Sequence, residues 1–199
     1  MVNRAKRSST TKGRQGKTRI IAGLWRGRQL VVEDVEGLRP TGDRVKEMLF
    51  NWLQPNIAGS RCLDLFAGSG GLGFESASRY AEQVVLVERD RLAAKRLASQ
   101  IERLDAQNLI TLHTTSAEQF LNDNSIFFDV IFVDPPFQDG LLDAILPLLP
   151  AHLSEGGLVY LESSAKQVAV PPAGFTLLKQ KTTGDVNARL FQFTAVRAD

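Results

Sequence analysis

A glycine-rich turn directly after an apolar run is the first feature of this 199-residue sequence that could do chemistry. The segment from Leu63 to Gly73 reads Leu-Asp-Leu-Phe-Ala-Gly-Ser-Gly-Gly-Leu-Gly. Glycine takes positive φ readily and has no Cβ to keep a ligand away from the backbone. Glu88 ends the next apolar run, where an acid accepts ribose hydroxyls in dinucleotide-type folds. The pattern predicts a nucleotide-containing cofactor. The residues expected to bind it are Asp64, Phe66, Ala67, Gly68, Ser69, Gly70, Glu88, Arg89 and, at the end of a later apolar run, Asp134.

Asp64 indicates which kind of cofactor this turn accepts. A pyrophosphate-binding turn meets negative charge with backbone N–H groups, so a carboxylate just before it would repel the phosphates. An acid there suits a cation, such as the ammonium group of S-adenosyl-L-methionine, and argues against a nicotinamide or flavin. The alternative is an acid that only caps the turn. Ser116 and Ala117 follow the third apolar run, where this cofactor class has its adenine contacts, although Ser116 fits a helix N-cap equally well.

A second segment, Asp129 to Phe137, is an apolar run that ends in Asp134, Pro135, Pro136 and Phe137. Two prolines make a rigid loop at the strand end where open α/β sheets bind ligands. The loop resembles motif IV of amino-methyltransferases. The resemblance implies that Asp134 and the next backbone carbonyl accept hydrogen bonds from an exocyclic NH2, with Phe137 stacked on the base. A plain turn with a core aromatic is the alternative.

The elements that must position these residues alternate along the chain. Apolar runs predict strands at 61–66, 84–88, 109–114, 128–134 and 157–162, with helices near 71–80, 90–104 and 140–149 and a helical turn after Ser116. Such β-α-β repeats imply a parallel sheet covered on both faces. Residues 175–181 and 189–196 have no helix between them and should close the sheet as an antiparallel pair. We therefore expect a seven-stranded, mostly parallel, Rossmann-like α/β fold.

The N-terminal part reads as an appendage to this fold. Residues 1–17 are polar and basic and predict a flexible arm. Residues 18–23 and 29–32 predict a hairpin around a turn at 25–28, in which Trp25 either packs on the core or stacks on a ligand. A helix follows with apolar positions at Val45, Met48, Leu49 and Trp52, ended by Pro55 and Gly59. We therefore expect three parts: a basic arm at 1–17, a hairpin and helix appendage at 18–55, and the Rossmann-like domain at 56–199.

Charge is distributed unevenly along the chain. The formal net charge is +2, yet residues 1–30 hold nine bases and no acid, so residues 31–199 carry −7. A basic segment of this kind predicts a polyanionic partner, while a merely solubilising tail is the alternative. The bases expected to bind phosphates of such a partner are Arg4, Lys6, Arg7, Lys12, Arg14, Lys17, Arg19, Arg26, Arg28, Arg44 and Lys46.

Composition excludes several classes of protein. One cysteine, Cys62, and two histidines, His113 and His152, argue against a disulfide framework and a metal site, so we expect no metal and a reducing cytoplasm. No apolar run has the 18 or more residues that a membrane span needs. An organellar transit peptide fits the basic N-terminus poorly, because the apolar face is missing. A monomer is the default expectation.

Taken together, residues 18–199 resemble the RsmD-type 16S rRNA guanine-N2 methyltransferases. The distinctive segments are Arg19 to Gly23, Arg39 to Glu47, Leu63 to Gly70 and Asp134 to Phe137. The resemblance implies methylation of one guanine N2 of 16S rRNA by S-adenosylmethionine, on an assembled or partly assembled 30S subunit. It also implies that the polyanion bound by the basic residues is RNA, and that Arg39 and Thr41 lie at the mouth of the active site and bind RNA as well.

Three other functions remain open on the sequence. A DNA adenine-N6 methyltransferase shares the Asp-Pro-Pro-aromatic loop, but no segment here could read a duplex sequence. A nicotinamide oxidoreductase is disfavoured by Asp64 and by the lack of a suitable proton donor near the strand ends. A non-catalytic RNA-binding assembly factor could keep the same fold.

Overall fold

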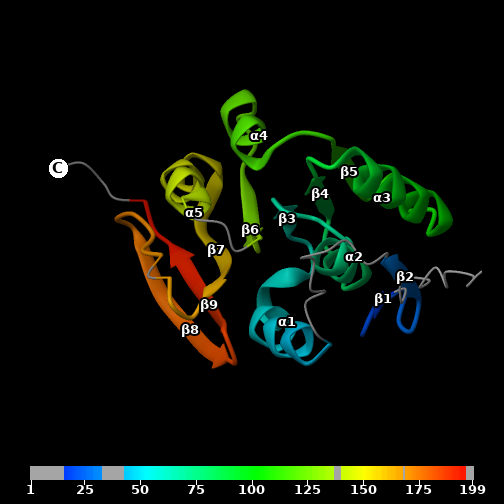
Figure 1. The fold of residues 1–199 in the computed structure, drawn as a ribbon, viewed down its shortest axis with the longest axis horizontal. Helices are drawn as coiled ribbons and strands as arrows, with labels where there is room; N and C mark the ends of the chain where they lie inside the picture. Colours follow the sequence, from blue (N-terminus) through cyan, green and yellow to red (C-terminus); the bar gives the residue numbers. More distant parts are fainter. Residues whose placement is uncertain (1–15, 33–42, 137–139, 168, 196–199) are drawn as a thin grey trace, which may run out of the picture.

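In a computed structural model the chain forms one seven-stranded sheet with helices on both faces and a small N-terminal hairpin (Figure 1). The structure describes residues 16–32, 43–136, 140–167 and 169–195. The elements are β1 (Gly16–Arg19), β2 (Gln29–Val32), α1 (Asp43–Ile57), β3 (Arg61–Asp64), α2 (Gly71–Ser78), β4 (Gln83–Val87), α3 (Arg91–Arg103), β5 (Ile110–His113), α4 (Ala117–Asp123), β6 (Phe128–Val133), α5 (Leu141–Ile145), η1 (Leu146–His152), β7 (Leu153–Ser164), β8 (Phe175–Thr183) and β9 (Val186–Phe193).

The order of strands in the sheet creates one place for a ligand. The order is β5-β4-β3-β6-β7-β9-β8. The pairs from β5 to β7 are parallel, and β9 runs antiparallel to both β7 and β8. Strands β4 and β5 are added on one side of β3, and the chain then returns to place β6 on the other side of β3. Open α/β sheets bind ligands at such a switch point, beyond the carboxyl ends of the strands.

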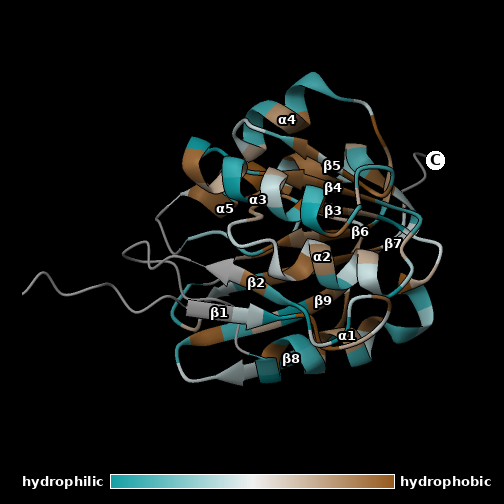
Figure 2. Ribbon diagram, turned by 90° about the vertical axis from the view of Figure 1, so that its right-hand side faces the viewer, coloured by the Kyte–Doolittle hydropathy of each residue, from teal (hydrophilic) through white to brown (hydrophobic). Residues whose placement is uncertain are grey.

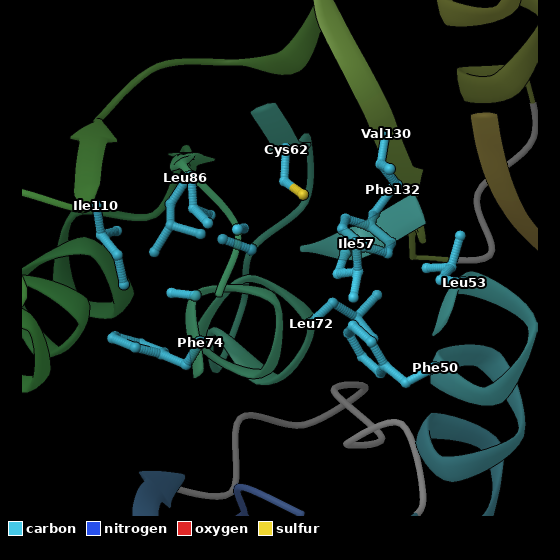
Figure 3. Packing of buried hydrophobic residues seen from close by; sticks show 14 of the residues in the cluster. Phe50, Leu53, Ile57, Cys62, Leu72, Phe74, Leu86, Ile110, Val130 and Phe132 are labelled. Carbon is cyan, nitrogen blue, oxygen red and sulfur yellow. The ribbon is translucent and has the colours of Figure 1, made fainter. Parts of the chain in front are cut away.

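The central strands form because their side chains are apolar on both faces, as a buried parallel sheet requires. All four residues from Val130 to Val133 have 0% exposure, and Figure 2 shows the central strands mainly in the hydrophobic colour. One core lies between the sheet and α1, α2 and α3. In Figure 3, Phe50 and Leu53 of α1 belong to this cluster together with Phe132 of β6. The second core lies under α4, α5 and η1.

The sequence predictions for the sheet are confirmed, including the antiparallel ending and the burial of Cys62 in a strand. Several boundaries differ. The last strand, β9, covers Val186–Phe193 rather than the expected 189–196. Strand β7 begins at Leu153, earlier than expected, with an irregular register opposite 128–130. Helix α1 continues past Pro55 to Ile57, whose carbonyl oxygen accepts hydrogen bonds from the backbone N–H and hydroxyl of Ser60 at 3.2 and 2.7 Å. These bonds support the last turn, where proline removes only one donor.

The N-terminal hairpin is docked on helix α2. Strand β1 begins at Gly16, before the expected start, and ends at Arg19 rather than at Gly23, because the following residues turn onto α2. Leu24 N–H donates to the Ser78 carbonyl at 2.8 Å, and Trp25 N–H donates to the Ser78 hydroxyl at 2.9 Å. A Cβ on Gly23, where φ is +81°, would lie 1.7 Å from the Ser78 oxygen. Trp25 is 8% exposed, which confirms that it packs on the core.

Among the described residues, no helix combines the length and the apolar character that crossing a membrane requires.

Candidate functional site

Acidic residues stand at the carboxyl ends of three neighbouring strands, on both sides of the switch point. Asp64 is the last residue of β3, Glu88 follows β4, and Asp134 follows β6. Because β4, β3 and β6 are adjacent and parallel, these ends meet at one edge of the sheet. The structure thus brings together the acids of the two segments that the sequence singles out.

Asp64 is a buried carboxylate that is only half satisfied. It is 1% exposed, and its Oδ2 accepts a hydrogen bond from the Gly73 N–H at 3.1 Å. Its Oδ1 is buried and has no hydrogen-bond partner among the described residues. Burial raises the pKa of Asp64 to about 7, and the charges of Asp134 and Glu88 add to the rise, while the backbone N–H groups of Gly73 and Phe66 oppose it. Burying a carboxylate oxygen without a hydrogen-bond partner costs free energy unless a ligand supplies that partner, and a cationic group would do so best.

Glu88 holds the glycine-rich turn in place. Its Oε2 accepts the Gly68 N–H at 2.8 Å, and its Oε1 accepts the Asp90 N–H at 2.8 Å. Gly70 begins helix α2 with φ of 77°, and a Cβ there would lie 2.5 Å from ring carbons of Phe74. A carboxylate oxygen can accept more than one hydrogen bond. Glu88 therefore keeps the capacity to accept hydroxyl groups of a ligand while it fixes the turn.

The remaining residues predicted to bind the cofactor lie around this turn with different exposures. Ala67 is buried, Phe66, Gly68 and Ser69 are half-buried, and Arg89 is exposed. Beyond β5, the Ser116 hydroxyl accepts the Gln119 N–H at 3.1 Å and caps α4, and Ala117 is buried beneath it. The capping role of Ser116 is confirmed, and a contact with adenine stays a prediction.

The residues present fit S-adenosylmethionine. The unpaired Oδ1 of Asp64 is suited to an ammonium group, and Glu88 lies one strand away, where ribose hydroxyls would follow. Both of these side chains are carboxylates, which favours a cationic cofactor over a pyrophosphate.

The Asp-Pro-Pro-Phe loop begins at the edge as expected. Asp134 is half-buried, Pro135 is buried and Pro136 is exposed, whereas Phe137 lies outside the described residues. The charge of Asp134 contributes to the raised pKa of Asp64 on one side and of Glu162 on the other. The charge of Asp134 therefore acts both on Asp64, at the end of β3, and on Glu162 of β7.

Four of the predicted RNA-binding bases are exposed. They are Arg19, Arg26, Arg28 and Arg44. Arg19 Nε also pairs with Asp43 Oδ2 at 2.8 Å in a solvent-exposed ion pair. The bases of residues 1–15, together with Arg39 and Thr41, lie outside the described residues, and so does the side chain of Lys17.

The prediction for Lys46 is wrong. Lys46 is 0% exposed, and its Nζ donates to the Arg19 carbonyl at 2.6 Å and to the Thr18 hydroxyl at 3.2 Å. Burial lowers the pKa of Lys46, while the charges of Glu75 and Asp43 oppose the change. An ammonium enclosed in this way ties β1 to α1 and cannot meet an RNA phosphate at the surface.

Sequence reasoning missed two acids. Glu75 of α2 is 0% exposed and accepts the Ile21 and Ala22 N–H groups at 2.7 and 3.1 Å, which anchors the hairpin. Glu162 of β7 is 6% exposed and accepts the Tyr160 hydroxyl at 2.5 Å. The signal for Glu162 was present in the sequence, since it ends an apolar run as Asp64 and Glu88 do. Glu75 has no such signal.

The fold and the site together define a methyltransferase of the Rossmann-like class, with carboxylates at the switch point for a cationic cofactor and an Asp-Pro-Pro loop beside it. The family profile described as "Conserved hypothetical protein 95" matches residues 18–192. Ribosomal RNA small subunit methyltransferase D of Haemophilus influenzae is 46% identical over 187 residues, 92% of this chain and 97% of that protein. The Escherichia coli protein of the same name is 44% identical over 180 residues, 89% of this chain and 90% of its own.

A solved structure agrees with these matches. The putative methyltransferase yhhF from Escherichia coli superposes with a TM-score of 0.85 at 41% identity, covering 91% of this chain and all of that chain. The chain therefore belongs to the RsmD family, the family of the methyltransferase D proteins.

Proposed function

We propose that this protein transfers a methyl group from S-adenosylmethionine to the exocyclic N2 of one guanine in 16S rRNA. The observation that carries the proposal is the pair of acids on adjacent strands β3 and β6. Asp64 is buried with one oxygen unpaired, and Asp134 opens the Asp-Pro-Pro-Phe loop beside it. The relatives at 46% and 44% identity carry names that specify ribosomal RNA of the small subunit.

Asp64 and Glu88 would hold the cofactor. Asp64 Oδ1 would accept the ammonium group, and Glu88 would accept ribose hydroxyls from the position in which Gly68 fixes it. When bound, S-adenosylmethionine supplies an electrophilic methyl group on a sulfonium. The protein's task is then to orient the acceptor base against that methyl group.

Asp134 and the carbonyl of Pro135 would orient the base. The lone pair of a base amino group is conjugated into the ring and is a poor nucleophile. Two acceptors on its hydrogens favour a tetrahedral nitrogen whose lone pair can point at the methyl group, and positioning supplies most of the rate. Asp134 would receive the proton that the methylated nitrogen loses. Phe137 would stack on the base, which is worth about 1–3 kcal/mol.

Basic side chains would bind the RNA around this site. The target must be a loop nucleotide or a flipped base, because a duplex hides the guanine amino group in a groove. Arg26, Arg28 and Arg44 are exposed, and residues 1–17 carry six of the nine bases before residue 31. We propose that these bases contact phosphates of 16S rRNA in an assembled or partly assembled subunit. The protein would act as a monomer in the cytoplasm.

The test is radiolabelled methyl transfer to naked 16S rRNA, to 30S subunits that lack the modification, and to DNA, side by side. We expect label in guanine N2 of 16S rRNA and no label in DNA. Asp134→Ala should abolish transfer with the fold intact by circular dichroism. Label in DNA adenine, or RNA binding without any transfer, would replace the proposal by one of the other functions.

The arm has its own measurement. Deletion of residues 1–15, which leaves β1 complete, should weaken RNA binding and lower the slope of log affinity against log salt by about 0.7 for each lost phosphate contact on single strands. Cofactor affinity should not change. An unchanged slope would remove the arm from the RNA-binding surface.

A further inference from the structure

Strand β7 carries a second acid next to Asp134 that the mechanism above does not use. Strands β6 and β7 are parallel neighbours, and Val133 pairs with Leu161. The next residues along these strands are Asp134 and Glu162. Adjacent strands lie about 4.8 Å apart, so these two carboxyl groups start from neighbouring positions at the same edge of the sheet.

Both acids belong to the face of the sheet that α1 covers. Phe132 and Tyr160 pair across β6 and β7 and pack in the core under α1, with ring centroids 6.4 Å apart. Side chains alternate along a strand, so the residues two positions further, Asp134 and Glu162, follow on that face. Asp64 lies on it as well, two residues after Cys62 of the same core.

Glu162 is held in one orientation. It is 6% exposed, and Tyr160, which is 0% exposed, donates its hydroxyl to Oε1 at 2.5 Å. Burial raises the pKa of Glu162 to about 8, and the charge of Asp134 adds to the rise, while the Tyr160 hydroxyl opposes it. The carboxyl group therefore keeps its proton at neutral pH, and an N–H donor from a ligand would lower its pKa and favour the ionised acceptor.

We propose that Glu162 is a specificity-determining residue that accepts the N1–H of the target guanine, an inference that rests on the proposed function. Guanine presents its N1–H directly beside the N2 amino group. If Asp134 holds the amino group, a carboxyl group on the next strand meets N1. Ionised Glu162 would repel the lone pair that adenine carries at N1, whereas the protonated form could donate to it, so the bases are compared above pH 8. Tyr160 then acts as a positioning residue, because its hydroxyl fixes the Glu162 carboxyl group.

The experiment compares guanine with an analogue that lacks both the N1–H and the O6, so the role of Glu162 is read from how its variants change the preference. Small subunits are reconstituted on 16S rRNA in which the guanine methylated by the wild-type protein is kept, or is replaced by 2-aminopurine. That analogue keeps the amino group at position 2 and has no hydrogen on N1. We expect the wild-type protein to favour guanine by at least about 10-fold in kcat/KM, as for a charge-assisted hydrogen bond.

Glu162→Gln should lower this preference to about 3-fold or less, because an amide can donate to N1 of 2-aminopurine or accept from N1 of guanine. Tyr160→Phe should lower it in the same direction and provides a second variant if Glu162→Gln does not fold. Glu155→Gln is the matched control, since Glu155 is exposed at the other end of β7. It should leave the preference unchanged.

Two outcomes would overturn the inference. One is a wild-type protein that methylates both bases equally. The other is a pair of variants that lose activity on both bases in the same proportion, as a purely structural role of the Tyr160–Glu162 pair requires. Failure of the proposed function differs from both, because the wild-type protein would then label no guanine N2 at all.

Discussion

Replacing Asp64 by asparagine should make the ligand-free protein more stable and weaken its binding of S-adenosylmethionine. Asparagine keeps the shape of the side chain and an oxygen that can accept the Gly73 N–H, now 3.1 Å from Oδ2. It removes a charge that is 1% exposed and whose Oδ1 has no partner among the described residues. The buried charge lowers the stability of the ligand-free protein but favours binding of a cationic ligand. The variant should therefore raise stability and lower cofactor affinity.

The size of the effect follows from the pKa of Asp64. The pKa rises from 3.8 to about 7 on folding. At 1.36 kcal/mol for each pH unit, ionised Asp64 costs the folded state at most about 4 kcal/mol above pH 7. The new amide N–H groups cost about 1–3 kcal/mol where they find no acceptor. The net gain in the free energy of unfolding is then about 1–3 kcal/mol at pH 8.

The pH dependence has a definite sign. Between pH 3.8 and about 7 the folded state keeps a proton on Asp64 that the unfolded chain has lost. Because the folded state binds more protons, the contribution of Asp64 to stability falls as pH rises through this window. The advantage of the asparagine variant over the wild-type protein should therefore grow by about 3 kcal/mol from pH 5 to pH 8.

Urea unfolding at pH 5 and pH 8, followed by circular dichroism, measures the stability, and calorimetry measures the binding. We expect cofactor affinity to fall by at least about 10-fold, as for the loss of a hydrogen bond to a charged group. Asp129→Asn is the matched control, because Asp129 also accepts a backbone N–H, that of Arg61 at 2.8 Å, but lies at the start of β6, away from the site. The reasoning is refuted if Asp64→Asn destabilises the ligand-free protein at pH 8 or binds S-adenosylmethionine as the wild type does.

Four further substitutions probe how the site and the RNA-binding surface are supported. Gly73→Ala places a Cβ 2.2 Å from Leu86 Cδ2, so the free energy of unfolding should fall by about 1–3 kcal/mol in urea titrations, and an unchanged value would contradict the close packing of α2 on the sheet. Glu75→Ala leaves two backbone N–H groups of the hairpin turn without their acceptor. The free energy of unfolding should fall by about 2–4 kcal/mol, and hydrogen exchange in that turn should become faster. Slow exchange there would show that other contacts dock the hairpin. Lys46→Met should leave the salt dependence of RNA binding unchanged, because Lys46 is 0% exposed, whereas Arg28→Ala should lower the slope by about 0.7 if Arg28 contacts a phosphate. Equal slopes for these two variants would contradict the assignment.

Much of the fold could be predicted because its signals are local. The alternation of apolar runs with helical patterns predicts β3 to β7 and the helices between them, and the missing helix before residue 189 predicts the antiparallel ending. The glycine-rich turn and the acid at the end of β3 are likewise visible in a few consecutive residues. Each of these features depends on neighbours in the chain, which the sequence displays directly.

Burial of charged residues could not be predicted in this way. Lys46 occurs in a polar segment among other charges, and its enclosure depends on contacts with Thr18 and Arg19, 28 and 27 residues earlier. Glu75 looks like a solvent-facing residue of a helix, yet it binds the backbone of a turn 53 and 54 residues earlier. The free energy of a buried charge is decided by distant partners, and these are known only when the chain is folded.

The sequence alone determined which residues end the strands and that these ends are acidic. The tertiary structure decided which ends are neighbours, because the order β4-β3-β6-β7 places acids on consecutive strands that are far apart in the chain. That order leaves Oδ1 of Asp64 without a partner among the described residues and puts Glu162 next to Asp134. The physical reason is that desolvation and charge repulsion act through space, over a few ångströms, whereas the sequence records only proximity along the chain.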